Sequence, residues 1–275
     1  MKIAPGTLMA LFPSANPVAI DTIARGAGTF ERYGINTPLR MAHFLAQIAH
    51  ETGGLRVLEE NGNYTNPDRL RAIFPRQFPT LSCALDYAGN AERILNRAYA
   101  NIIGNGDEMS GDGFRFRGRG FIQITGRHNY TDYGKRLDVD LVENPDQAKV
   151  GDTALKIACL YWDRQQLNKY ADIESFEAVR TISRGVNLGN PQSTKTPNGL
   201  EDRYAEFQRI YDALREFEPE PEIAPAPEVN VNIPNIQFPA PDLKEIDWAI
   251  GGSRLRAVFS AIKFAVGILF GRLAR

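Results

Sequence analysis

Glu51 stands at the end of a predicted helix, where a carboxyl group could act as a general acid. One face of this helix, which we expect over residues 37–52, carries the apolar side chains Met41, Phe44, Leu45 and Ile48. Glu51 falls at the edge of that face, and both partial burial and the negative end of the helix dipole disfavour its ionised form. A carboxyl group that keeps its proton near neutral pH suits acid catalysis. The alternative is a glutamate that points into solvent, as we predict for His43 and His50 on the opposite side.

A second carboxylate follows Glu51 within ten residues. Glu59 and Glu60 precede Asn61-Gly62-Asn63, a polar stretch typical of a turn. Glycoside hydrolysis usually needs an acid together with a base or nucleophile, and a solvated loop carboxylate suits a base that activates water. An adjacent pair of glutamates is more commonly two ordinary solvated charges, so the spacing alone is weak evidence for a catalytic base.

Residues 114–130 mix arginine, glycine and aromatic side chains. We predict a short strand over Phe114–Thr125, in which Gln123 and Thr125 face the same side and offer an amide and a hydroxyl group to a sugar or a water. Such a composition also occurs in RNA-binding segments. The near-zero net charge of residues 1–216 and the lack of an RNA-recognition sheet pattern argue against nucleic acid as a partner.

The elements that must position these groups are mostly helical. Apolar residues recur at helical spacing over residues 15–32, 37–52, 153–167 and 200–214, whereas alternating strand patterns are scarce. Hydrophobic residues make up 43% of the chain and charged residues 24%, as in an ordinary soluble globular protein. Cys83 and Cys159 match no disulfide framework or zinc motif, so we expect two buried thiols. We therefore predict a mainly helical domain over residues 1–216 with a short β element.

The composition changes after residue 216. Residues 217–247 are acidic and rich in proline, so we expect an extended linker. The spacing of apolar residues over 248–275 predicts an amphipathic helix with cations flanking its apolar face. This arrangement suits binding to an anionic membrane surface. Its apolar face comprises Leu255, Val258, Phe259, Ile262, Val266, Leu269 and Leu273. Docking of this helix on the first domain or on another protein is the alternative.

Four segments together resemble the catalytic domain of glycoside hydrolase family 19, in its bacteriophage endolysin branch. They are AHFLAQIAHETGG, EENGNY, YANIIGNGDEMSGDGFRFRGRGFIQITGRHNY, and SRGVNLG followed by NGLEDR. They occur in the expected order across about residues 41–210 and cover nearly all of the first domain. The resemblance implies a mainly helical, α+β lysozyme-like fold with a substrate cleft.

The resemblance also implies roles for individual residues. Glu51 matches the general acid, Glu60 the general base, and Thr125 the residue that helps to hold the catalytic water. The substrate-binding positions that it implies are Gln123, Asn129, Tyr130, Asn187 and Arg203, the last of which could instead be structural. Asn187 is the least secure match, because Leu188 stands where the family has glycine. Glu60 is preferred to Glu59 on motif register alone. Family members invert the anomeric centre, which requires room for a water between the carboxyl groups, and need no metal or organic cofactor.

Peptidoglycan and chitin both contain β-1,4-linked N-acetylglucosamine units. The phage-lysin-like motifs, a poor signal peptide and the lack of an aromatic-rich chitin-binding module favour peptidoglycan; chitin, or a cell-wall-binding module without turnover, are the alternatives. For a phage lysin we expect a monomer that accumulates in the host cytoplasm and acts on the wall in the periplasm after holin-type release. Carriage in the virion is the alternative to release.

Overall fold

A computed structural model of the chain describes residues 1–216, which belong to one compact unit. The predicted linker over 217–247 and the predicted amphipathic helix over 248–275 lie outside the described residues. The first helices along the chain are α1 (Pro5–Leu11), α2 (Pro17–Arg25), α3 (Ala27–Arg32), α4 (Pro38–Glu51), α5 (Pro67–Ile73), α6 (Leu81–Tyr87), α7 (Ala91–Ala98) and α8 (Asp112–Arg115). They are followed by α9 (Arg127–Leu137), α10 (Gly151–Arg164), α11 (Asn168–Ala171), α12 (Phe176–Leu188) and α13 (Leu200–Arg215), with 3-10 turns at Glu108–Ser110 and Pro145–Lys149.

Helix α4 begins and ends where its sequence predicts. The Thr37 side chain accepts a hydrogen bond from the Arg40 backbone at 3.2 Å, and Pro38 occupies the first turn, where no backbone donor is needed. The helix ends at Glu51, and Gly53 then adopts a positive φ of 59°, which favours glycine. The cap and the glycine thus fix Glu51 as the last residue of a rigid element.

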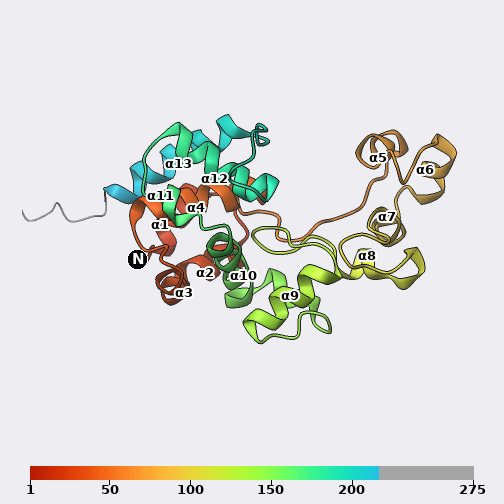
Figure 1. The fold of residues 1–275 in the computed structure, drawn as a ribbon, viewed down its shortest axis with the longest axis horizontal. Helices are drawn as coiled ribbons and strands as arrows, with labels where there is room; N and C mark the ends of the chain where they lie inside the picture. Colours follow the sequence, from red (N-terminus) through yellow and green to blue (C-terminus); the bar gives the residue numbers. More distant parts are fainter. Residues whose placement is uncertain (217–275) are drawn as a thin grey trace, which may run out of the picture. The chain divides into compact units, whose positions relative to one another are not determined.

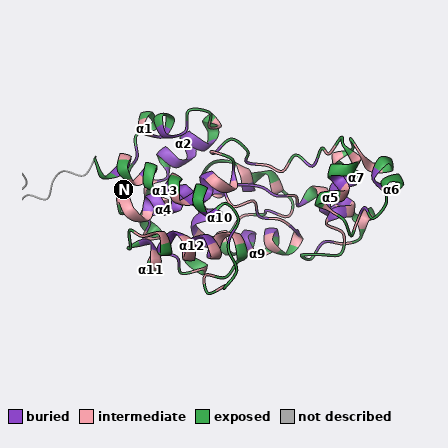
Figure 2. Cartoon of the chain, turned by 90° about the horizontal axis from the view of Figure 1, so that it is seen from above, coloured by how far each residue is buried: buried purple, intermediate pink, exposed green. Residues whose placement is uncertain are grey.

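Helix α4 is buried on more than the one face that its apolar pattern indicates. Residues 41–49 are all buried, and α13 packs along the helix on the side opposite the apolar face (Figures 1 and 2). The prediction that His43 is exposed is therefore wrong. Its ring stacks on Phe207 of α13 with centroids 4.0 Å apart, and its Nε2 lies 3.0 Å from the Ile173 carbonyl oxygen. His50 is half-buried. A helical pattern shows the most apolar face, but it does not show which second helix will cover the other.

Two smaller clusters of buried side chains lie outside this main core. One is formed by Leu70, Phe78, Ala84 and Ile94, from α5, α6, α7 and the turn after α5. The other is formed by Phe116, Ile124, Tyr130, Tyr133, Leu141, Ala148 and Ile157. In Figure 1, helices α5–α8 stand apart from α4 and α13, and the stretches 52–66 and 116–126 run between the two groups. The carboxylate pair Glu59–Glu60 lies in the first of these stretches, a few residues beyond Glu51.

The predicted strand over Phe114–Thr125 does not form. Its first residues belong to α8, Gln123 has a left-handed φ of 51°, and strand-like pairing within residues 1–216 is confined to isolated bridges of Arg119 with Glu59 and with Ile124. The physical reason is Arg119, which is only 2% exposed. A buried cation needs several oxygen partners, and the observed turns bring backbone and side-chain oxygens around it.

None of the helices in the part of the chain that the structure describes is long and apolar enough to cross a membrane.

Candidate active site

Glu51 forms an ion pair with a buried arginine from helix α13, far away along the sequence. The Arg203 guanidinium, 1% exposed, donates from Nη2 to Glu51 Oε1, from Nη1 to Gln47 Oε1 at 2.6 Å, and from Nε to the Asn198 carbonyl at 3.0 Å. The Glu51 side chain is 23% exposed, so one of its edges stays open to solvent. Sequence reasoning considered only burial and the helix dipole at Glu51. It missed the cation because Arg203 lies 152 residues further along the chain.

Glu60 is held by neutral donors. The Tyr99 hydroxyl donates to Glu60 Oε1 and Oε2 at 2.9 and 3.1 Å, and the Gly118 N–H donates to Oε2 at 3.2 Å. Burial, together with the charge of Glu60, raises the pKa of Tyr99 far above its usual range, so the phenol keeps its proton. These two donors hold the Glu60 carboxylate in one orientation. Tyr99 lies in the YANIIGNG part of a motif segment, but nothing in its spacing indicated a partner 39 residues earlier.

Glu59 has a different environment from its neighbour. Its carboxylate lies 2.5 Å from Arg117 Nη2, 2.9 Å from Arg119 Nε and 2.7 Å from Lys149 Nζ. Burial raises the pKa of Glu59, but the Lys149 hydrogen bond and the two arginine charges outweigh it and hold that pKa below its ordinary value. Glu59 therefore neutralises a cluster of cations. Glu60, which has no ion pair within residues 1–216, is the better candidate for a base.

Gln123 lies beside Glu60, on the far side of Gly118. A Cβ atom on Gly118 would sit 2.9 Å from Gln123 Oε1 and 3.4 Å from Glu60 Cβ, so only glycine allows the two side chains this approach. Gln123 Nε2 donates to the Gly120 carbonyl at 2.8 Å. The half-buried Thr125 hydroxyl donates to the Gln123 carbonyl at 3.1 Å, and the Asn129 amide donates to the Thr125 carbonyl at 2.8 Å. These predicted residues thus form one hydrogen-bonded turn beside the base.

Tyr130 does not line a cleft in the structure, which corrects its predicted role in substrate binding. Its side chain is fully buried, its hydroxyl donates to the Arg117 carbonyl at 2.7 Å, and it accepts from Arg119 Nη1 at 3.0 Å. Burial raises the pKa of Tyr130 to about 12, so the phenol stays neutral. Tyr130 lies in the first turn of α9, and a buried hydroxyl needs partners more than an exposed one does. It therefore fixes the backbone that carries Gly118.

Asn187 does not contact Glu51 itself but is connected to it through Asn198 and Arg203. Its Oδ1 accepts from the Asn198 backbone N–H at 3.0 Å, and the Asn198 carbonyl in turn accepts from Arg203 Nε. Asn187 is half-buried near the end of α12. The structure thus joins Asn187, Arg203 and Glu51 through one loop, although Leu188 replaces the glycine of the motif.

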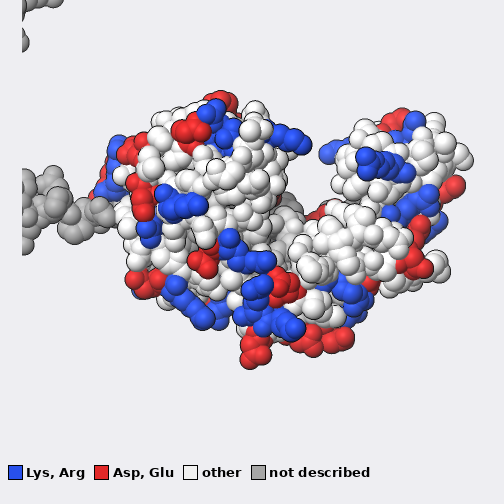
Figure 3. Space-filling view, in the orientation of Figure 1, with Lys and Arg blue, Asp and Glu red and all other residues white. Residues whose placement is uncertain are grey.

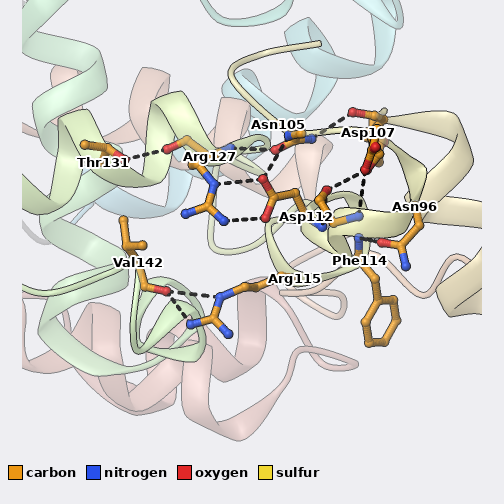
Figure 4. Close-up of polar contacts among 12 residues, drawn as sticks. Asn96, Asn105, Asp107, Asp112, Phe114, Arg115, Arg127, Thr131 and Val142 are labelled. Atoms are coloured by element: carbon orange, nitrogen blue, oxygen red, sulfur yellow. Dashed lines mark hydrogen bonds and ion pairs between the residues drawn. The ribbon is translucent and has the colours of Figure 1, made fainter. Parts of the chain in front are cut away.

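An ion pair between the buried Asp112 carboxylate and Arg127 fixes the stretch that supplies Tyr99 (Figure 4). The Asp112 carboxylate, which is 3% exposed, accepts from Arg127 Nε at 2.8 Å and from the Gly106 N–H at 2.9 Å. The Asn105 amide accepts from the Arg127 N–H at 2.8 Å and donates to the Tyr99 carbonyl at 2.9 Å. The Arg127 hydrogen bond also holds the pKa of Asp112 below its usual value. The stretch from Tyr99 to α8 is therefore anchored to the start of α9.

The molecular surface is hollowed between the part that holds α4, α12 and α13 and the part that holds α5–α7, and basic side chains stand on both sides of the hollow (Figure 3). Glu51 ends α4 on one side, and Glu60 lies in the stretch 52–66 that runs between the two parts. Within residues 1–216, no group of three or more His, Cys, Asp or Glu side chains could hold a metal ion.

The chain is similar to known glycoside hydrolases. It is 40% identical over 188 residues to a glycosyl hydrolase family 19 domain-containing protein of Haemophilus influenzae, covering 68% of this chain and 90% of that protein. The chain belongs to glycoside hydrolase family 19. The family model for chitinase class I matches residues 82–178. An endochitinase of Pisum sativum is 28% identical over 155 residues, 54% of this chain and 42% of the relative.

A solved structure supports the fold. The crystal structure of a chitinase C mutant aligns with a TM-score of 0.50 and 20% identity, covering 78% of this chain and 76% of that one. The mainly helical, lysozyme-like fold predicted from the sequence is confirmed, and the protein is a chitinase-like glycoside hydrolase.

Proposed function

We propose that this family 19 hydrolase cleaves β-1,4 glycosidic bonds of peptidoglycan with inversion, with Glu51 as the acid and Glu60 as the base. The observation that carries this assignment is the contrast between two adjacent carboxylates. Glu59 is neutralised by three cations, whereas Glu60 is oriented by the Tyr99 hydroxyl and the Gly118 N–H. An oriented, ionised carboxylate without a cationic partner can take a proton from water.

The proposed reaction is a single displacement at the anomeric carbon, in which water replaces the leaving sugar. Glu51 gives its proton to the glycosidic oxygen as the bond to the anomeric carbon breaks, and water attacks that carbon from the opposite face while Glu60 takes a proton from it. Glu51 ends ionised and Glu60 protonated, and exchange with solvent restores both. The Arg203 guanidinium stabilises the negative charge that develops on Glu51, an interaction that is stronger in the transition state than before proton transfer.

Charge on the two glycans favours peptidoglycan over chitin. Chitin is a neutral polymer, whereas the peptides of peptidoglycan carry carboxylates, which suit the basic side chains on both sides of the hollow. Chitin is the second candidate because relatives such as the Pisum sativum protein are named endochitinases.

Digestion of the two purified polymers tests the proposal. We expect the protein to release reducing ends from peptidoglycan faster than from chitin, and mass analysis of the products to identify the sugar that carries the new end. Glu51→Gln is nearly isosteric and should lower the rate by about 10²–10⁴-fold. Faster turnover of chitin would replace the proposed substrate, and Glu51→Gln activity within twofold of the natural protein would refute the assigned acid.

We further propose that the hydrolase serves host lysis by a phage and that residues 248–275 bind an anionic membrane. The support is the cationic amphipathic pattern of these residues in the sequence. Deleting residues 249–275 should leave hydrolysis of purified peptidoglycan intact and should reduce binding to anionic liposomes and killing of intact cells. Equal liposome binding by the truncated chain would contradict the membrane role.

A further inference from the structure

A polar cavity adjoins the proposed base and has no role in the two-carboxylate chemistry. Its volume is about 340 Å³, and its lining includes Glu60, Asn61, Asn63, Tyr64, Asn66 and Arg69. All of these residues belong to one continuous segment that leads from the base into α5. Because Glu60 is part of the wall, a sugar placed for attack beside this carboxylate would have its substituents within reach of the cavity.

Arg69 is the cation of this cavity. Its side chain is exposed and makes no ion pair or hydrogen bond with any residue in the range 1–216. The neighbouring Asp68 is directed to Arg71 instead, with 3.6 Å between their charged atoms. Burial raises the pKa of Tyr64, the charge of Glu60 raises it further, and Arg69 lowers it, so both charged groups act on the same phenol. Arg69 therefore presents an unneutralised guanidinium beside the catalytic segment.

Three asparagine side chains, Asn61, Asn63 and Asn66, line the same cavity as this cation. Asn61 Oδ1 accepts from the Asn63 N–H at 3.1 Å, and Asn66 Oδ1 accepts from the N–H groups of Asp68 and Arg69 at 2.9 and 3.1 Å. These contacts engage the side-chain oxygens of Asn61 and Asn66. The side-chain NH₂ groups of the two residues donate to no acceptor within residues 1–216 and are therefore available to a ligand. A guanidinium with several amide donors is a set that binds a carboxylate.

We propose that this cavity binds a carboxylate of the peptide attached to the muramic acid unit, with Arg69 as its ionic partner. The inference rests on the proposed function and adds a basis for choosing between the two glycans. Chitin carries no carboxylate to pair with Arg69, whereas peptidoglycan carries one or more on alternate sugars. The planar guanidinium suits bidentate pairing with such a group.

Binding of soluble peptidoglycan fragments tests the proposal. Affinities would be measured by calorimetry with the full chain carrying Glu51→Gln, so that the fragments are not cleaved. The fragments would be used intact and after their carboxylates have been amidated. We expect Arg69→Gln to weaken binding of the intact fragment about three- to tenfold. Amidation should weaken binding by a similar factor, and the two changes together by no more than either alone.

Arg76→Gln is the matched control, because it removes the same charge from an exposed position in the turn after α5 that is not part of the cavity. This variant should keep its full sensitivity to amidation. The proposal is overturned if the effects of Arg69→Gln and amidation multiply, or if Arg76→Gln behaves like Arg69→Gln. Release of reducing ends by the unaltered protein decides the proposed function separately, since the calorimetric comparison gives its result without turnover.

Discussion

Removing the Tyr99 hydroxyl should lower kcat/KM, because this hydroxyl orients the Glu60 carboxylate that we propose as the base. In Tyr99→Phe, the Glu60 carboxylate loses the donor that reaches both of its oxygens and keeps the Gly118 N–H at 3.2 Å. A hydrogen bond to a charged group contributes about 1.5–3 kcal/mol. Glu60 is half-buried, so water replaces part of the lost contact and the lower figure applies. At about 1.4 kcal/mol for each factor of ten in rate, kcat/KM should fall about tenfold.

The assay is kcat/KM on a soluble glycan substrate at one neutral pH, because this quantity reports stabilisation of the transition state relative to free enzyme and substrate. We expect kcat to fall as well, since a carboxylate that is no longer held orients water less well.

Tyr87→Phe is the matched control for this experiment. The Tyr87 hydroxyl also donates to a glutamate, Glu108, at 2.6 Å, but away from the two candidate carboxylates. Its removal should lower the melting temperature and leave kcat/KM unchanged. An unchanged kcat/KM in Tyr99→Phe, or an equal loss in Tyr87→Phe, would refute the reasoning.

Three further predictions follow from the contacts of single residues. Glu60→Gln should reduce kcat by at least 10²-fold, whereas Glu59→Gln should mainly lower the melting temperature by breaking the cation cluster; the reverse order would mean that the loop is misassigned. Burial lowers the pKa of His43 to about 4, below its value of about 6.5 in an unfolded chain, so the folded state binds this proton less tightly and stability falls as pH drops from about 6.5 to 4. The loss is about 3 kcal/mol, and denaturant unfolding at both ends of this range should show it in the natural protein and not in His43→Gln. Arg203→Lys keeps the charge but cannot satisfy all three acceptors of the guanidinium. We therefore expect kcat to fall at least tenfold and the free energy of unfolding to fall by about 3 kcal/mol. Unchanged kinetics in this variant would exclude a role for Arg203 beside Glu51.

The sequence by itself determined the local elements and the candidate carboxylates. Thr37, Pro38 and Gly53 are enough to set the ends of α4, because caps and glycine turns depend on neighbours within a few residues. The position of Glu51 at the helix end follows directly. The motif segments were also sufficient to predict the family and the helical fold, since they span most of the domain in order.

Only the tertiary structure decided what surrounds each carboxylate. Arg203 and Tyr99 reach Glu51 and Glu60 across 152 and 39 residues of sequence, and no periodic pattern encodes such contacts. The burial of His43 depends on α13, which covers a face of α4 that its own pattern leaves polar. The strand expected around Arg119 gave way to turns, because a buried guanidinium needs oxygen partners from several directions. Charge pairing and burial are properties of the packed chain, and for that reason they separate Glu60 from Glu59 where the spacing of the residues could not.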